Sequence, residues 1–266
     1  MKHFYFSILF LHMCMLTYSQ SPHPVREYKL SEQAAAFSVD PMGSVYVVFE
    51  NGSLLKFDTT GTPVAIPGRK SKSSFWQIDA SDPYKIIVFN RDLQIADIYS
   101  SDFAKINNID FSMLETGDIS LMCSSYDNAF WTLSALNMDL VRLSEQLTIT
   151  SKTNAGLLLD FKNFTPTILQ ESGTNILLAQ KGGSAYIFDR FGNLRMHFNE
   201  KADYWSLDGD VLYYVLNDTL HAYQTQLHKE AIIETGCEKI NGIAVSSQWM
   251  AILNEKKITL FRKSNN

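Results

Sequence analysis

The chain has 266 residues, with 23 lysines and arginines against 28 aspartates and glutamates, so its formal net charge is −5. Hydrophobic residues make up 45% of the sequence, which is enough to build a core and argues against an intrinsically disordered chain. A mildly acidic chain is also a poor match for nucleic-acid phosphates and for anionic lipid surfaces.

The first nineteen residues have the pattern of a secretory signal peptide. A short basic start, residues 1–3, precedes the apolar run Phe4–Leu16, which is short for a bilayer span. Small residues at Thr17 and Ser19 then suit cleavage near position 19. We therefore expect a signal peptide over residues 1–19 and a single mature domain over residues 20–266. The alternatives are a buried or anchoring helix and a lipoprotein attached through Cys14, whose box lacks the usual small residue before the cysteine.

A short strand pattern recurs along the mature chain. Its clearest copies are Ala36–Asp40, Phe75–Asp79 and Tyr204–Asp208, each an alternating stretch that ends in Asp. Weaker copies are Ser120–Ser124, Pro166–Gln170 and Gly242–Ser246. The last positions, 40, 79, 124, 170, 208 and 246, are 38 to 46 residues apart.

Two further strands follow each copy. The second is apolar and comes after a turn rich in Gly, Asn, Asp or Pro: Val45–Val48, Ile86–Phe89, Ala129–Thr132, Ile176–Ala179, Val211–Tyr214 and Met250–Leu253. The third repeats an apolar pair three residues apart: Leu54/Phe57, Ile95/Ile98, Leu140/Leu143, Ala185/Phe188, Leu220/Tyr223 and Ile258/Phe261. A polar fourth strand fits after the first five copies, as at Thr62–Ile66 and Leu194–Phe198.

A repeat of about 40 residues with four short strands is typical of a β-propeller, in which stacking buries the blade faces and ring closure protects the edges. The sequence thus predicts an all-β fold, a six-bladed propeller. A β-sandwich or an irregular barrel is the alternative, although neither requires six equal strand triplets. The sixth copy has three strands, so we expect Val25–Leu30 near the N-terminus to supply its fourth and close the ring.

The mature chain has two cysteines, Cys123 and Cys237. Cys123 occupies the repeat position that carries Val39 in the first copy, so we expect it to be buried. The third and sixth blades lie on opposite sides of a six-bladed ring, too far apart for a disulfide. Two free thiols are expected.

Candidates for chemistry are few, and we expect no catalytic residue, no cofactor and no metal. His221 and His228 lie seven residues apart around a strand and its turn, which does not bring them together. Asp40, Asp79 and Asp208 could form a ring of carboxylates at one mouth, but an Asp at a strand end also caps the following turn, and the repeat favours the cap. Asp208-Gly209-Asp210 could likewise belong to a calcium loop, but it lacks the other acidic ligands.

Trp76 and Trp205 occupy equivalent repeat positions. Exposed tryptophans could stack on sugars or anchor a protein partner. Their periodic placement favours packing between blades.

The stretch Ser38–Val48, followed by Leu54–Gly61, resembles a blade of the NHL/TolB-like six-bladed propellers. The overall pattern also resembles exported propellers of the Bacteroidota. This resemblance implies the fold and is weak for function, because propellers host many activities. Some related propellers are enzymes with a calcium ion in the channel, and no ligands of that kind can be matched to residues here.

We expect a non-enzymatic, exported binding module: a scaffold or accessory subunit of a bacterial envelope complex, periplasmic or associated with the outer membrane, with a protein partner and no membrane span once the signal is removed. The alternatives are a carbohydrate-binding or sensing module that uses exposed aromatics and a metal-dependent, lactonase-like hydrolase. The candidate binding surface is the mouth formed by loops between first and second strands, with Pro41, Met42, Asp82, Pro83, Tyr126 and Asp127.

Overall fold

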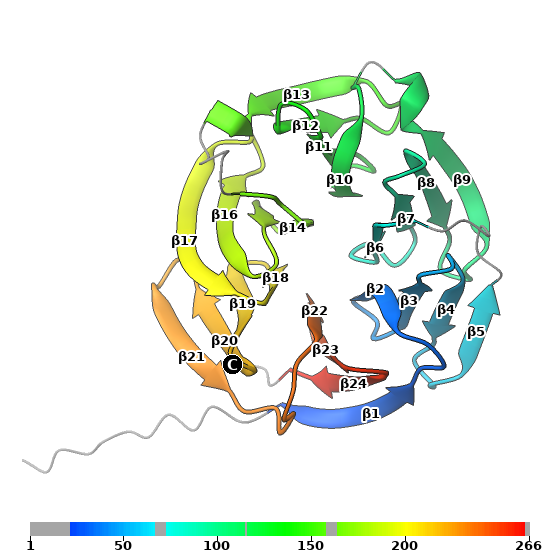
Figure 1. The fold of residues 1–266 in the computed structure, drawn as a ribbon, viewed down its shortest axis with the longest axis vertical. Coiled ribbons are helices and arrows are strands. Elements are labelled where there is room, and N and C mark those ends of the chain that lie inside the picture. Colours follow the sequence, from blue (N-terminus) through cyan, green and yellow to red (C-terminus); the bar gives the residue numbers. More distant parts are fainter. Residues whose placement is uncertain (1–21, 67–72, 115, 158–163, 264–266) are drawn as a thin grey trace, which may run out of the picture.

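The computed structural model describes residues 22–66, 73–114, 116–157 and 164–263. These residues form six four-stranded antiparallel sheets arranged in a ring around a central axis (Figure 1). The chain is therefore a six-bladed β-propeller, as the repeat predicts. The expected signal peptide and Cys14 lie outside the described residues.

Each of the first five blades uses four consecutive strands. Blades 1 and 2 contain β2 (Ala34–Val39), β3 (Val45–Phe49), β4 (Leu54–Phe57), β5 (Pro63–Ile66), β6 (Trp76–Asp79), β7 (Ile86–Asn90), β8 (Ile95–Tyr99) and β9 (Lys105–Asp110). Blades 3 and 4 contain β10 (Ile119–Ser124), β11 (Phe130–Ser134), β12 (Asp139–Leu143), β13 (Ile149–Asn154), β14 (Ile168–Ser172), β15 (Asn175–Ala179), β16 (Gly183–Asp189) and β17 (Leu194–Ala202). Blade 5 contains β18 (Tyr204–Asp208), β19 (Val211–Leu216), β20 (Thr219–Gln224) and β21 (Lys229–Ile233).

Blade 6 closes the ring with strands from both ends of the chain. It joins β22 (Gly242–Ser246), β23 (Trp249–Asn254) and β24 (Lys257–Arg262) to the N-terminal strand β1 (His23–Lys29), which pairs antiparallel with β24. The predicted closure is confirmed, with the strand starting two residues earlier than expected. Tyr28 and Leu30 bury their side chains between blades 6 and 1, so the closing strand also contributes to the core.

The hydrophobic core consists of six clusters, one at each junction between neighbouring blades. Because each blade is covered on both faces, second strands such as β3 and β7 are buried along their whole length and are continuously apolar rather than alternating. Trp76, Trp131 and Trp205 all belong to these clusters. The tryptophans in the repeat thus pack between blades, as expected.

The turn after β2 shows how closely blades 6 and 1 approach. Gly43 has a φ of +94° and its N–H donates to the Asp40 carbonyl over 3.0 Å. A Cβ atom at this glycine would lie 2.7 Å from the Trp249 ring. Glycine is therefore required both by the backbone conformation and by the tryptophan that covers it.

Blade 4 departs from the predicted register. Its inner strand covers Ile168–Ser172 rather than Pro166–Gln170. Pro166 has no N–H to give to a sheet, and Ser172 pairs with Asn175 across a two-residue turn, which moves the strand two positions along the chain.

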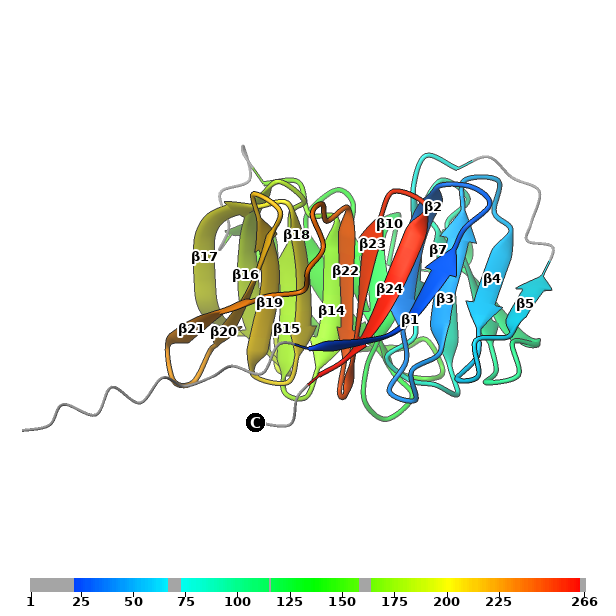
Figure 2. The same cartoon turned by 90° about the horizontal axis from the view of Figure 1, so that it is seen from below.

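Helical structure in the described residues is limited to two 3₁₀ turns, Phe111–Met113 and Ala155–Leu157. Within these same ranges, no helix has the length and apolar character needed to cross a membrane. The inner strands β2, β6, β10, β14, β18 and β22 surround the axis and run in the same direction along it (Figures 1 and 2). We call the end of the ring where they begin the entrance rim, and the end where they turn into the second strands the turn rim.

Candidate binding site in the central channel

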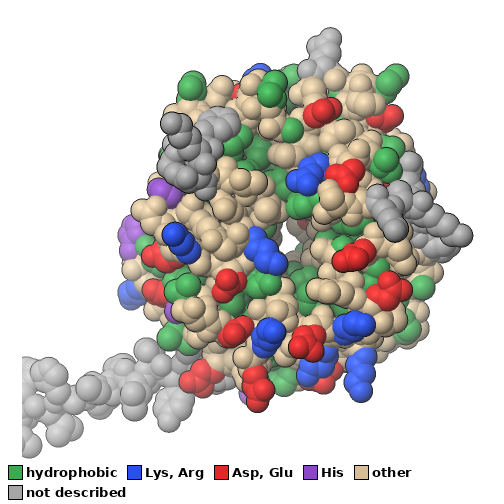
Figure 3. All heavy atoms as spheres, viewed as in Figure 1, with side chains coloured by type: hydrophobic (Ala, Val, Ile, Leu, Met, Phe, Trp, Pro, Cys, Tyr) green, Lys and Arg blue, Asp and Glu red, His purple; other side chains and the backbone are tan. Residues whose placement is uncertain are grey.

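A cavity of about 1040 Å³ occupies the channel and opens at the entrance rim. Figure 3 shows the opening, with basic and acidic side chains intermixed on the surrounding face. The walls come from β2, β6, β14, β18 and β22, joined at the rim by residues of the β15–β16 and β23–β24 turns. This volume matches the upper end of the range of about 300–1,000 Å³ that is usual for ligand pockets.

Much of the wall is apolar. Phe37, Phe75 and Tyr204 line the cavity with half-buried rings, and Ile168 and Ile243 also belong to its wall. The Phe37 ring lies so close to blade 6 that a Cβ atom at Gly242 would be 2.6 Å from it. The aromatic side chains are thus held in place by the blade junctions, and the wall is preformed.

Several polar side chains of the wall join neighbouring blades. Ser38 accepts a hydrogen bond from the Ala80 N–H over 3.2 Å, and Ser206 accepts from the Val245 N–H over 3.0 Å. In both cases an inner strand receives a backbone donor from the following blade: Val245 lies in β22, and Ala80 directly follows β6. These bonds satisfy strand edges that would otherwise face the channel unpaired.

Two glutamines make the same connection with both atoms of their amides. Gln170 accepts from the Leu207 N–H and donates to the Leu207 carbonyl, each over 2.9 Å, so its side chain imitates a neighbouring strand. Gln77 accepts from the Met122 N–H over 3.1 Å and donates to the Leu169 carbonyl over 3.3 Å. Gln77 therefore reaches from blade 2 past blade 3 to blade 4, and no β10 residue lines the cavity.

The three aspartates of the repeat do not form a ring of free carboxylates. Asp40 accepts from two backbone N–H groups of its turn and from the Tyr46 hydroxyl. Asp79 accepts from the Ser81 N–H within its turn and from the Ser124 N–H of blade 3. The cap interpretation is thus correct for these two. Asp208 differs, because its carboxylate forms an ion pair with Lys263 instead of capping the turn.

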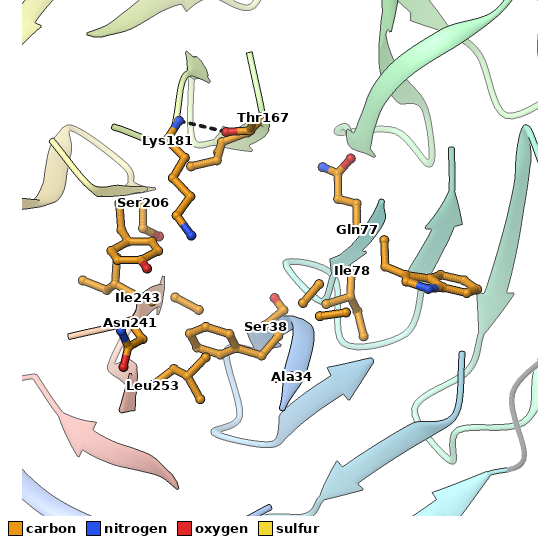
Figure 4. A pocket seen from close by; sticks show the side chains of 18 of the residues that line it. Ala34, Ser38, Gln77, Ile78, Thr167, Lys181, Ser206, Asn241, Ile243 and Leu253 are labelled. Atoms are coloured by element: carbon orange, nitrogen blue, oxygen red, sulfur yellow. Dashed lines mark hydrogen bonds between the residues drawn. The ribbon is translucent and has the colours of Figure 1, made fainter. Parts of the chain in front are cut away.

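Three exposed lysines, Lys181, Lys239 and Lys256, line the cavity at the entrance rim. None of them forms an ion pair with a carboxylate in the described ranges. The Nζ atom of Lys181 lies 4.7 Å from the centre of the Tyr204 ring, and Figure 4 shows its side chain pointing into the channel. The other charged residues of the lining are the exposed Glu255 and the hydrogen-bonded Asp79.

The turn that carries Lys181 is fixed in position. The Lys181 N–H donates to the Thr167 hydroxyl over 2.9 Å (Figure 4). The Trp205 indole N–H donates to the carbonyls of Gln180 and Gly183 over 3.1 and 3.2 Å. The backbone that carries the Lys181 side chain is therefore held in place by these hydrogen bonds.

The surface predicted from the sequence lies at the other end of the ring. The turns between first and second strands in blades 1, 2 and 3 carry Pro41, Met42, Asp82, Pro83, Tyr126 and Asp127, and all of them lie at the turn rim. None of the six lines the cavity. The ring of Tyr126 lies beneath two guanidinium groups, those of Arg142 at 4.0 Å and Arg190 at 4.9 Å. Whether this rim binds a partner stays a prediction.

The remaining candidates have structural partners. The Nδ1 atom of His221 lies 2.7 Å from Glu230, and that of His228 lies 2.9 Å from the Tyr223 hydroxyl, so the two histidines do not face each other. Cys123 is buried and Cys237 is half-buried, and both thiols are free, as expected. Across the described ranges, no three His, Cys, Asp or Glu side chains are grouped so as to hold a metal ion.

No family model matches the chain, and no curated protein matches its sequence. Solved structures share its fold. Virginiamycin B lyase from Staphylococcus aureus is similar with a TM-score of 0.59 and 11% identity, over 89% of this chain and 98% of that one. The Swd1 propeller domain from Myceliophthora thermophila (TM-score 0.62, 8% identity, 91% and 100% coverage) and a chain of the mitotic checkpoint complex (0.62, 8%, 99% and 99%) are also similar. At these identities the similarity shows the β-propeller fold alone.

Proposed function

We propose that this propeller is a non-enzymatic binding module whose channel receives part of a protein partner at the entrance rim. One observation carries the proposal: the cavity is large and preformed, its rings are exposed to it, and its polar wall groups are used in hydrogen bonds between blades. A rigid concave surface with apolar anchors loses little entropy when a partner binds.

The similar solved structures support this proposal only through the fold that they share with this chain. One is a chain of the mitotic checkpoint complex, which is an assembly of proteins by its name. Virginiamycin B lyase is an enzyme by its name, so the same architecture also serves catalysis. In this chain, the described histidines lie on β1, β17 and β20 and in the β20–β21 turn, away from the cavity lining. That placement favours binding over acid–base chemistry in the channel.

We also propose that the protein acts outside the bacterial cytoplasm, as an accessory subunit of an envelope complex. The support is the signal-like pattern of residues 1–19. Fractionation of the native host, with an antibody against the chain, tests this location independently of binding. Recovery of the full-length chain in the cytosol would contradict it.

Site-specific photo-crosslinking in the native host tests the binding surface. A benzoylphenylalanine replaces the exposed Gln33 at the entrance rim, with matched controls at Asp127 on the turn rim and Lys229 on the outer strand β21. We expect one protein to be crosslinked from position 33 and not from position 229. A crosslink only from position 127 would move the site to the turn rim, and no specific crosslink from any position would contradict a protein partner.

A further inference from the structure

The lining of the channel is positively charged where it meets solvent. Lys181, Lys239 and Lys256 come from three different turns and converge on one opening, where Glu255 is the exposed acid of the lining. Asp203 and Glu238 lie on neighbouring loops but do not line the cavity. Unpaired ammonium groups at the mouth of a low-dielectric cavity attract anions and favour a ligand that brings its own negative charge.

Next to the lysines the wall is apolar. Phe75 directly precedes β6, Ile168 and Tyr204 begin β14 and β18, and Phe37 and Ile243 lie further along β2 and β22, so these side chains face the cavity from its opening inward. A ligand that fills it must therefore carry apolar groups beyond its charged part. A sugar chain would need many hydrogen-bonding partners for its hydroxyls, and the wall amides of Gln77 and Gln170 are already bonded to backbone groups.

The depth of the channel suits an extended polypeptide. Its inner strands contain between four residues, in β6, and six residues, in β2. At about 3.3 Å per residue, the wall is roughly 13–20 Å deep, so an extended segment of about four to six residues spans it. Apolar side chains at the inserted end of such a segment would contact the rings just inside the opening, while residues at the other end stay beside the exposed lysines.

We infer that the channel takes an extended polypeptide segment with apolar side chains at the inserted end and acidic residues at the end held by Lys181, Lys239 and Lys256. This inference rests on the proposed function and specifies the chemistry of the partner. Charge selects the segment and steers its approach, and burial of its apolar end retains it.

A designed peptide tests the inference. The probe is acetyl-Leu-Phe-Leu-Ser-Glu-Asp-Glu with fluorescein beyond the acidic end, and binding is measured by fluorescence anisotropy. One control peptide has lysines in place of the acids, and another has serines in place of the apolar residues. We expect the probe to bind at least about tenfold more tightly than either control and to bind more weakly at higher salt.

Charge reversal at the rim supplies the matched variants. The triple variant carries Lys181→Glu, Lys239→Glu and Lys256→Glu. Its affinity for the probe should fall by about tenfold or more, and it should bind the lysine peptide, a gain that only a folded protein can show. Lys105→Glu, Lys229→Glu and Arg262→Glu make the same charge change at exposed positions of β9, β21 and β24, at the turn-rim ends of these strands, and should leave probe affinity unchanged.

Other outcomes overturn the inference. Equal binding of the lysine peptide to the unaltered protein would exclude selection by charge, and equal loss in both triple variants would mean that only net charge matters. Equal affinity for polyglutamate would show that the site accepts any polyanion. If a partner crosslinks from position 33 but its binding changes neither with salt nor with charge reversal, this inference is wrong and the proposed function still holds.

Discussion

The two rims of the propeller use charged residues in opposite ways. At the turn rim, the Asp40 carboxylate is buried and accepts hydrogen bonds from Met42 and Ser44 N–H groups and from the Tyr46 hydroxyl. Lys85 is also buried, donates to the Ala129 carbonyl over 3.2 Å and lies over an aromatic ring. At the entrance rim, Lys181, Lys239 and Lys256 are exposed and form no ion pair in the described structure.

The charges at one rim are thus buried and bonded within the fold, whereas the lysines at the other rim are exposed and form no ion pair in the described structure. A buried charge is tolerated only when its partners replace the water that it has lost, so residues such as Asp40 are fixed by the fold. An exposed lysine keeps its hydration and costs the fold little, which leaves it available to a partner. Substitutions at the two rims should therefore have effects of very different size on folding.

The largest loss of stability is expected for Asp40→Ala. Three donors lose their acceptor, and one of them, the Tyr46 hydroxyl, is fully buried. Since each unsatisfied buried group costs about 1–3 kcal/mol, the free energy of unfolding should fall by roughly 3 kcal/mol or more. Urea denaturation followed by fluorescence measures it, and Asp40→Asn, which keeps an acceptor oxygen, should lose less. A loss below about 1 kcal/mol would show that the turn rim does not depend on this carboxylate.

Gln170→Ala should have the next largest effect, because it removes both hydrogen bonds to Leu207 and exposes a strand edge to the channel. Water in the open channel can replace part of what is lost, so we expect about 1–2 kcal/mol in the same denaturation experiment. Gln33→Ala is the matched control, since it removes the same side chain at an exposed place on the entrance rim. Equal losses at positions 33 and 170 would refute the structural role of the wall glutamine.

A smaller effect should appear in alkaline solution. Burial, with the Asp40 carboxylate beside it, raises the pKa of the Tyr46 phenol well above its usual value of 10.0. Its contribution is therefore complete below pH 10 and is lost as the pH rises toward the folded-state pKa, because the unfolded phenol ionises first. By pH 10.5 this costs about 0.8 kcal/mol.

Comparison of Tyr46→Phe with the unaltered protein isolates this phenol. The variant should be less stable at neutral pH, and the gap should narrow between pH 10 and 11. Tyr28, Tyr213 and Tyr214 also have raised pKa values through burial, so the variant should keep part of the alkaline loss. A gap that stays constant over this range would mean that Tyr46 titrates alike in the folded and unfolded states.

The sequence predicted the fold well where local chemistry decides it. The Asp40–Gly43 turn has the residues that its backbone needs, and the apolar run Val45–Val48 shows a strand buried on both faces. The closing strand could be predicted because blade 6 lacked a partner and Val25–Leu30 was available. The register of blade 4 was missed because Pro166 and Thr167 precede the strand and a two-residue turn shifts it.

The candidate site could not be predicted in the same way. Lys181 belongs to blade 4, whereas Lys239 and Lys256 flank β22 and β23 of blade 6, and only the packing of the blades into a ring brings Lys181 to the same opening. Gln77 and Gln170 contact residues 37 to 92 positions away, so no local pattern specifies their partners. The available signal was a glutamine that directly follows an apolar residue of the inner strand, Trp76 in β6 and Leu169 in β14.

The smallest effect on folding, and the sharpest test of the two-rim comparison, is expected for Lys181→Ala, Lys239→Ala and Lys256→Ala together. These exposed side chains form no ion pair in the described structure, so the free energy of unfolding should change by no more than about 0.5 kcal/mol. Removal of three like charges from one opening also relieves mutual repulsion, which favours a change toward higher stability at low salt. Denaturation at two salt concentrations measures both effects. A loss near that of Asp40→Ala would mean that the entrance rim, like the turn rim, is held by its charges, and the contrast between the rims would fail.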